Sequence, residues 1–299
     1  LQSRHRGGRG YLGLLLLAAE LTQTGPVPPV TLSFILGQAA LYIGLVPSMD
    51  LSLSQVCISP VWVYYRRDYL RLLLGSFYHA DDWHLYYNMV SFLWKGRTLE
   101  RMMGSAYFLI LIAVFAPLIG CVEVALAFAA EAGMGKSHYL SDCSVGFSGV
   151  IFALKVLTTY NLPPGVSYVM GFLPVHSRLA VWAELVIIQL VTPNASLLGH
   201  LAGILVGLAY VKGPLRLIME PLCLGILGGN RTRFYRPWGW GWAGGSSSSS
   251  REERRADRSF QDEPPPPPPP TRRSNSATAV SDEELRQRRL ARFGQTAVQ

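Results

Sequence analysis

Six apolar stretches, separated by connectors of glycine, proline and charged residues, dominate the first 211 positions of the chain. An α-helix of about 20 apolar residues crosses the ~30 Å hydrocarbon core of a bilayer. The second, fourth and fifth stretches are short or carry polar residues. The pattern predicts an all-α membrane protein with six transmembrane helices, at residues 29–46, 83–99, 106–130, 144–160, 179–191 and 195–211.

Charged residues make up only 15% of the chain, against about 25% in soluble domains. Of the 46 charged residues (27 Lys+Arg and 19 Asp+Glu), 18 lie beyond residue 250, which predicts a membrane body followed by a polar tail. The net charge of +8 comes without the aromatic-interleaved basic patch of nucleic-acid-binding proteins. We therefore expect the lipid bilayer, and no nucleic acid, among its partners.

The segment after the last apolar stretch has a different composition. A serine run at 246–250 and a proline run at 264–270 bury too little apolar surface to offset the entropy of ordering. Residues 213–280 are predicted to be a disordered linker and residues 294–299 a disordered end. Most Lys and Arg residues beside the spans fall at one face, although three arginines of the 47–82 loop are exceptions. That face is predicted to be cytosolic, with both termini on it because the span count is even.

Residues 1–28 combine three arginines with an apolar run at 11–21. No small-x-small cleavage site follows this run, and Glu20 interrupts it, so an interfacial or re-entrant helix in a cytosolic segment fits better than a signal peptide. The four cysteines are far apart, without the spacing of a zinc site or a compact disulfide framework, and are interpreted as packing residues.

Polar residues inside membrane spans are candidates for function because burying them there is costly. In the fourth span, Ser148 lies between Gly146 and Gly149, at a predicted helix start whose backbone N–H groups lack intrahelical partners. Such donors can hold an oxyanion. The alternative is a Ser/Gly face that serves only helix packing.

The sixth span carries a ridge of glycines, with Gly199, Gly203 and Gly207 at i, i+4 and i+8. Small residues at this spacing let two helix backbones approach closely. Close approach to the fourth span would bring His200 near Ser148, as a general base for the hydroxyl. A histidine in a span can also be a packing residue.

The second span begins near three further polar residues, His79, His84 and Asn88. His84 and Asn88 are four residues apart and share a helical face, so both can donate to one oxygen that gains negative charge during acyl transfer. Metal binding is the competing interpretation. No carboxylate or thiolate stands at ligand spacing with these histidines, so no metal is expected.

The three motifs together resemble the rhomboid intramembrane serine proteases, across residues 29–212. The resemblance implies that Ser148 is the nucleophile and His200 the base of a Ser–His dyad, without cofactor. It also implies that His84 and Asn88 form the oxyanion hole, with His79 in support, and that Phe152 stacks on the catalytic histidine. Arg71 matches the arginine of the family's first-loop Trp-Arg signature, but Leu70 replaces the tryptophan.

Residues 281–293 resemble the arginine-rich motif with which an endoplasmic-reticulum member of this family recruits the valosin-containing AAA ATPase. Ser281 and Glu284 form a capping box, and acidic residues precede the basic ones, which favours a short helix. The alternatives are a solvated charged tail or binding to anionic lipid. The acidic ubiquitin-interacting helix of that relative has no counterpart here. The residues predicted to bind a partner are Arg286, Arg288, Arg289, Leu290, Arg292 and Phe293.

The resemblance implies an endoplasmic-reticulum membrane protease that cleaves membrane-protein clients destined for degradation, with its site open to the lumen. The rival function is a non-catalytic rhomboid-like adaptor that binds clients and recruits the ATPase. Depth counting from the span ends also predicts that Lys155 and Glu184 meet as an ion pair. Snorkelling of Lys155 to the interface is the alternative.

Overall fold

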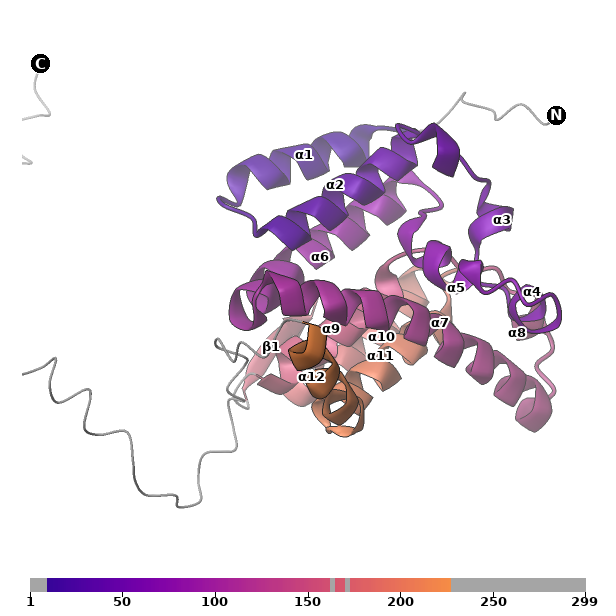
Figure 1. The fold of residues 1–299 in the computed structure, drawn as a ribbon. Coiled ribbons are helices and arrows are strands. Elements are labelled where there is room, and N and C mark those ends of the chain that lie inside the picture. Colours follow the sequence, from indigo (N-terminus) through magenta and orange to yellow (C-terminus); the bar gives the residue numbers. More distant parts are fainter. Residues whose placement is uncertain (1–9, 162–164, 170–172, 227–299) are drawn as a thin grey trace, which may run out of the picture. The chain divides into compact units, whose positions relative to one another are not determined.

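The structure, a computed structural model, describes residues 10–161, 165–169 and 173–226 (Figure 1). The predicted linker beyond residue 226, the arginine-rich helix and the disordered end lie outside these residues. Within them the chain is helical apart from one antiparallel hairpin of β1 and β2. The elements are α1 (Leu12–Gln23), α2 (Pro29–Ile43), η1 (Pro47–Met49), α3 (Leu53–Val56), α4 (Pro60–Tyr65), α5 (Leu70–Leu74), η2 (Gly75–Phe77), α6 (Asp82–Met103), α7 (Ser105–Met134), α8 (His138–Ser141), α9 (Ser148–Asn161), β1 (Val166–Val169), β2 (Leu173–His176), η3 (Ser177–Leu179), α10 (Ala180–Val191), α11 (Leu197–Val211) and α12 (Pro214–Ile226).

Each of the six predicted spans overlaps one of these helices, namely α2, α6, α7, α9, α10 and α11 in chain order. By length and composition, one helix of the described residues, α7, is long and apolar enough to cross a membrane by itself. The helices α11 and α12 meet that criterion together, with a bend of 71° between them. The helical fold class is therefore confirmed, and six crossings stay a prediction.

The core lies where α6, α7, α9 and α11 pack together, and α9 and α11 share the most extensive contact. Four phenylalanines with no or almost no exposed surface fill its centre, and leucines and small residues surround them. Edge-to-face and offset ring contacts join three of the rings across different elements. These phenylalanines are Phe92, Phe108, Phe115 and Phe147.

A buried carboxylate near the end of α6 holds the start of α2. Glu100 accepts hydrogen bonds from the Val30 amide at 2.9 Å and from the Thr31 amide at 2.7 Å, and Thr31 Oγ1 donates at 2.7 Å as well. The first amides of a helix lack intrahelical acceptors, and the helix dipole favours negative charge there. Glu100 therefore both satisfies α2 and fixes it on α6.

The start of α1 is held in the same way at the other end of α6. Asp82 accepts hydrogen bonds from the Gly13 amide at 2.6 Å and the Leu14 amide at 3.1 Å. Near the end of α6, Arg97 donates to the Thr24 carbonyl, just past the end of α1. Thus α1 runs parallel to α6 and packs against it, as Figure 1 shows, and its interfacial placement stays a prediction.

The predicted disordered linker begins too early, because Pro214–Ile226 forms α12. This helix has apolar residues at helical spacing, and Leu215, Met219 and Cys223 join the main core. Composition pointed to disorder because the serine and proline runs further along dominate the segment. The apolar residues at its beginning are sufficient to fold one more helix onto α11.

Candidate active site

The predicted nucleophile and base come together in the structure. Ser148 is the first residue of α9 and His200 lies in the first turn of α11. His200 Nε2 is 3.0 Å from Ser148 Oγ, which is hydrogen-bond distance. The other ring nitrogen, Nδ1, is buried and makes no hydrogen bond with any residue in the described ranges. The geometry is that of a two-residue pair in which the imidazole can take the hydroxyl proton.

Glycines allow this close approach, as the spacing predicted. A Cβ on Gly203 would stand 2.1 Å from the Gly149 carbonyl oxygen, and one on Gly149 would stand 3.1 Å from the Gly199 oxygen. A Cβ on Gly207 would be 2.9 Å from the Ala153 oxygen. Real Cβ atoms do not approach backbone oxygens as closely as 2.1 Å, so any side chain at Gly203 would push α9 and α11 apart.

Phe152 lies one turn beyond Ser148 and faces the histidine. Its ring centroid is 4.7 Å from that of His200, with an angle of 34° between the planes. Both rings are almost completely buried. An aromatic neighbour at this distance restricts the rotation of the imidazole, and so helps to keep Nε2 directed at Ser148.

His84 lies against the segment that leads into Ser148. A Cβ on Gly146 would be 2.7 Å from both Cε1 and Nε2 of His84, so the ring edge occupies the space that this glycine leaves. The Ala80 amide donates to His84 Nδ1 at 3.4 Å. In the neutral ring this places the hydrogen on Nε2, the atom beside Gly146. Gly146 has φ +119°, which side-chain-bearing residues rarely adopt.

Asn88 is buried one turn after His84. One of its amide hydrogens is donated to the His84 carbonyl at 2.8 Å, which fixes the side chain and leaves the second hydrogen for another acceptor. Its role in an oxyanion hole stays a prediction, as does that of His84.

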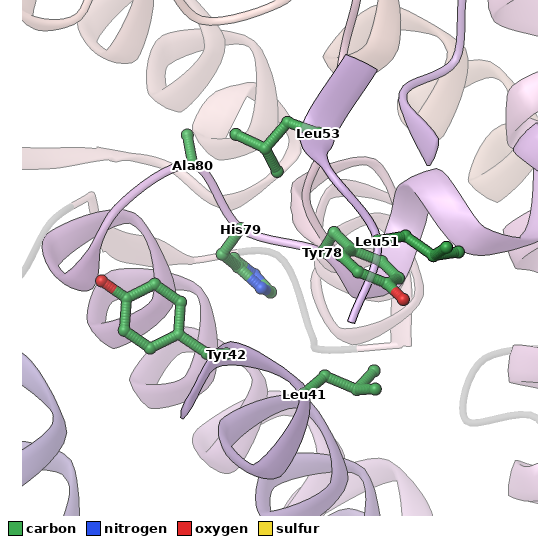
Figure 2. A pocket seen from close by; sticks show the side chains of 7 residues that line it. All are labelled: Leu41, Tyr42, Leu51, Leu53, Tyr78, His79 and Ala80. Carbon is green, nitrogen blue, oxygen red and sulfur yellow. The ribbon is translucent and has the colours of Figure 1, made fainter. Parts of the chain in front are cut away.

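The ring of His79 packs against the ring of His84. The two ring centroids are 5.0 Å apart in an edge-to-face arrangement. Burial lowers the pKa of His79 well below the ordinary histidine value, and the nearby His84 lowers it further. His79 is therefore neutral at physiological pH. Neither of its nitrogens has a hydrogen-bond partner in the described part of the chain. The side chain borders a cavity of about 80 Å³ (Figure 2), lined also by Leu41, Tyr42, Leu51, Leu53, Tyr78 and Ala80.

The site residues all lie within one recognised domain. Residues 66–216 match the sequence profile of the Rhomboid domain family. Rhomboid-related protein 4 from Mus musculus is 46% identical over 228 residues, which cover 76% of this chain and 70% of the relative. The chain belongs to the rhomboid family.

Other relatives agree with this assignment. Rhomboid-related protein 4 from Homo sapiens is 46% identical over 222 residues, 74% of this rhomboid and 68% of the relative. Rhomboid-like protein 14, mitochondrial, from Arabidopsis thaliana is 38% identical over 212 residues, 69% of this chain and 63% of the relative. The motifs around His79, Ser148 and His200 predicted membership of the rhomboid family, and these comparisons confirm it.

A carboxylate that the sequence analysis missed joins the two segments that carry Ser148 and His200 in this rhomboid. Glu123 Oε1, in the middle of α7, accepts hydrogen bonds from Ser144 Oγ at 2.7 Å and Ser196 Oγ at 2.8 Å. Ser196 caps α11, because its Oγ accepts from the Gly199 amide at 3.0 Å. Glu123 therefore connects the segment before α9 with the segment before α11, because both donate to the same carboxylate oxygen. The available signal was an acidic residue inside an apolar span.

The interpretation of all four cysteines as packing residues was wrong. Cys57 and Cys143 form a disulfide, while Cys121 and Cys223 are free. The bonded residues are 86 positions apart, and no local spacing in the sequence predicts the pair. Only the path of the loops between α2 and α9 brings them together.

The disulfide lies beside a short β-bridge that positions the approach to Ser148. Ile58 and Ser144 exchange two backbone hydrogen bonds, at 2.8 and 3.1 Å. Two residues further on, the Gly146 amide donates to the Gly75 carbonyl at 2.8 Å. The segment that ends at Ser148 is therefore tied to the 47–82 loop along its length.

The predicted ion pair between the fourth and fifth spans is present. Lys155 Nζ lies 2.9 Å from Glu184 Oε2, with 14% and 13% of the two side chains exposed. The pair connects α9 to α10 in the half of the bundle away from Ser148. No group of three potential metal-ligating side chains occurs among the described residues.

Proposed function

We propose that this rhomboid is an intramembrane serine endopeptidase that cleaves membrane-protein clients in or near the bilayer. The observation that carries the proposal is the 3.0 Å approach of His200 Nε2 to Ser148 Oγ. An aligned hydroxyl and imidazole at this distance can activate a nucleophile that is otherwise weak. A non-catalytic adaptor would need neither this contact nor the Phe152 ring beside it.

In the proposed reaction, Ser148 Oγ attacks the carbonyl carbon of the scissile peptide bond while His200 Nε2 takes the hydroxyl proton. The tetrahedral intermediate collapses when the imidazolium returns that proton to the leaving amine. Water then attacks the acyl-enzyme, with His200 again acting as base, and Ser148 is released. All proton transfers pass through Nε2, so Nδ1 keeps its hydrogen throughout.

Three donors are proposed to stabilise the oxyanion: His84 Nε2, the free amide hydrogen of Asn88, and the backbone amide of Ser148. The tautomer set by the Ala80 amide supplies the hydrogen on His84 Nε2. The amide of Ser148 begins α9 and lacks an intrahelical acceptor. Removal of one such donor commonly lowers kcat by about 10²–10³.

The test uses the full chain, purified and reconstituted in liposomes with a single-span client. Cleavage should be lost in Ser148→Ala and in His200→Ala, while Ser33→Ala, at an exposed position on α2, should cleave normally. A fluorophosphonate probe should label the wild type and Ser33→Ala but not Ser148→Ala. Equal product from the wild type and Ser148→Ala would favour the adaptor function instead.

The proposed location is the endoplasmic-reticulum membrane, with the site open to the lumen. The Cys57–Cys143 disulfide lies at the same end of the bundle as Ser148, and disulfides persist in oxidising compartments such as that lumen. The cytosolic end then carries Arg97 and the bend between α11 and α12, and the C-terminus is proposed to be cytosolic.

The orientation of α1 supports a different proposal for the N-terminus. Because Gly13 donates to Asp82, the start of α1 lies at the Ser148 end of the bundle, which favours a lumenal N-terminus over the cytosolic one that the sequence predicted. In sealed microsomes, protease should digest a tag at the C-terminus and spare a tag placed before α1. Digestion of both tags would support the sequence-based prediction that both termini are cytosolic.

A link to protein degradation is proposed through residues 281–293, which lie outside the described residues. We propose that their arginines pair with acidic groups of the valosin-containing AAA ATPase and that Leu290 and Phe293 supply apolar anchors. A peptide of this segment should retain the ATPase, and Arg288→Ala with Arg289→Ala should abolish retention. Binding to anionic liposomes without the ATPase would point to lipid.

A further inference from the structure

The two sulfurs of the Cys57–Cys143 disulfide differ in exposure. Cys57 has 2% of its surface exposed, whereas Cys143 is exposed. Thiol–disulfide exchange begins when an external thiolate reaches one sulfur along the axis of the bond. Only Cys143 offers that access, which makes Cys57 the sulfur that leaves.

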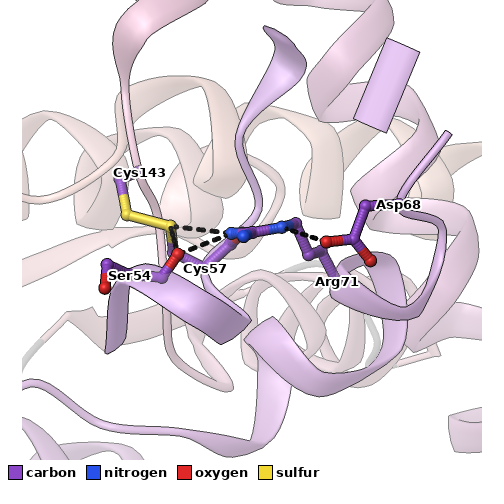
Figure 3. A network of polar contacts seen from close by, with 5 residues as sticks. All are labelled: Ser54, Cys57, Asp68, Arg71 and Cys143. Atoms are coloured by element: carbon purple, nitrogen blue, oxygen red, sulfur yellow. Dashed lines mark hydrogen bonds and ion pairs between the residues drawn. A yellow bond between two sulfur atoms is a disulfide. The ribbon is translucent and has the colours of Figure 1, made fainter. Parts of the chain in front are cut away.

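The leaving sulfur lies beside a buried cation. Arg71 Nη1 is 3.6 Å from Cys57 Sγ, and the same nitrogen donates to the Cys57 and Ser54 carbonyls at 3.1 and 2.8 Å. Arg71 Nε is paired with Asp68 at 2.7 Å, so the guanidinium is held in place from both sides, as Figure 3 shows. A guanidinium at hydrogen-bond distance favours the thiolate form of a cysteine and makes it a better leaving group.

We propose that Cys57–Cys143 is a site of thiol–disulfide exchange, at which a dithiol reagent attacks Cys143 and Cys57 leaves as a thiolate beside Arg71. The reagent class is a dithiol, either a dithiol oxidoreductase of the same compartment or a small dithiol such as dithiothreitol. The bond is asymmetric, because Cys57 is buried, Cys143 is exposed and a cation lies beside the leaving sulfur. This asymmetry directs the attacking thiolate to Cys143.

A reagent thiolate forms a bond to Cys143 Sγ as the Cys57–Cys143 bond breaks and the electron pair goes to Cys57. The second reagent thiolate then attacks its neighbour in the mixed disulfide, closes the reagent's own disulfide and releases Cys143. The dithiol loses two electrons and two protons, and the two cysteines end as thiols.

Reduction would alter the approach to Ser148. Cys143 lies next to Ser144, whose backbone pairs with Ile58, and the Gly146 that follows lies against His84. Without the covalent link, this segment is held to the 47–82 loop by backbone hydrogen bonds, two with Ile58 and one with Gly75. The amide of Ser148 and the edge of His84 then lose their fixed relation, so client cleavage falls on reduction. This consequence rests on the proposed protease activity, whereas the exchange itself does not.

The exchange is tested on the full chain in detergent by acid quenching, followed by denaturation in SDS and maleimide labelling, so that buried thiols also react. Two cysteines, Cys121 and Cys223, should label before reduction and all four afterwards. With glutathione, the mixed disulfide should form on Cys143. Labelling of four cysteines in non-reduced protein purified from an oxidising compartment, or a glutathione adduct on Cys57, would overturn the proposal.

The role of Arg71 is tested by the rate of reduction with dithiothreitol. Arg71→Gln should slow it roughly tenfold, because the leaving thiolate loses its cation. Arg71→Lys should retain most of the rate, and Arg67→Gln, at an exposed arginine of the same loop, should leave it unchanged. Both variants at position 71 can lower stability, but only Arg71→Lys keeps a cation, so the difference between their reduction rates reports on the charge. Equal rates in these two variants would contradict the proposal.

The activity measurement separates this inference from the proposed function. Cleavage of the single-span client should fall at least severalfold in reduced protein and in the Cys57→Ser/Cys143→Ser variant, and return when the reduced wild type is reoxidised. If the exchange occurs as described and cleavage is unchanged, the regulatory consequence is wrong. If no form of the protein cleaves, the proposed protease function fails and the exchange site stands.

Discussion

The carbonyl oxygen of Gly149 stands 2.1 Å from the position that a Cβ of Gly203 would take. The backbones of α9 and α11 are therefore in direct contact one turn away from the dyad. Helices in this contact have little freedom to slide, and the contact fixes the distance between Ser148 Oγ and His200 Nε2. The geometry of the proposed Ser148–His200 dyad thus depends on two residues that carry no side chain.

Gly203→Ala is expected to destabilise the protein by about 1–3 kcal/mol and to reduce cleavage strongly, because the added methyl group forces the helices apart. The control is Gly37→Ala in α2, where a Cβ would meet nothing within 4 Å. Thermal unfolding in detergent and fluorophosphonate labelling measure both effects. Normal labelling of Gly203→Ala would show that the helices adjust without disturbing the dyad.

Glu123 is expected to position Ser148 and His200 through the two serine hydroxyls that donate hydrogen bonds to it. Glu123→Gln retains a carbonyl acceptor and should keep most of the activity. Glu123→Leu leaves the partly buried hydroxyls of Ser144 and Ser196 without their acceptor, at a cost of about 1 kcal/mol for each, and should lower kcat. Glu131→Leu, near the end of the same helix, is the matched control. Equal activity of the Gln and Leu variants would exclude a positioning role.

Lys155 and Glu184 should be energetically coupled. In a double-mutant cycle with Lys155→Met and Glu184→Gln, each single variant leaves a mostly buried charge without its partner, so the double variant should be more stable than additivity predicts. The expected coupling is about 0.5–3 kcal/mol, measured by equilibrium unfolding in mixed micelles. Additive effects would show that the 2.9 Å contact contributes no net stability.

His79 should make stability depend on pH. Because burial lowers its pKa in the folded protein, the unfolded chain binds a proton below about pH 6.5 that the folded chain does not yet accept. The contribution of neutral His79 to the free energy of unfolding is therefore complete above pH 6.5. It is lost as the pH falls from there towards the lowered pKa of the folded state. The slope of this loss reaches about 1.4 kcal/mol per pH unit.

The variant His79→Gln should flatten the loss of stability between pH 6.5 and 5, when unfolding is followed by tryptophan fluorescence. His138→Gln, at an exposed histidine, should leave the slope unchanged. A slope in His79→Gln equal to that of the wild type would mean that His79 is protonated in the folded state as readily as in the unfolded chain.

Several relationships of the site followed from the sequence because each depends on a fixed helical period. Glycines at i, i+4 and i+8 define one face whatever surrounds the helix, and this face predicted the contact between Gly203 and the fourth span. Counting residues from the span ends predicted the pairing of Lys155 with Glu184, since depth in a helix grows by a constant 1.5 Å per residue. The approach of His200 to Ser148 follows from the first of these regularities.

Tertiary structure alone decided the rest. The Cys57–Cys143 bond depends on the path of the 47–82 loop, and the position of α1 depends on which carboxylate of α6 meets its first amides. Glu123 was visible as a costly residue in an apolar span, but its partners come from loops 21 and 73 residues away. Helical periodicity determines which residues share a face; it contains no information on where a loop returns, and loops bring these residues together.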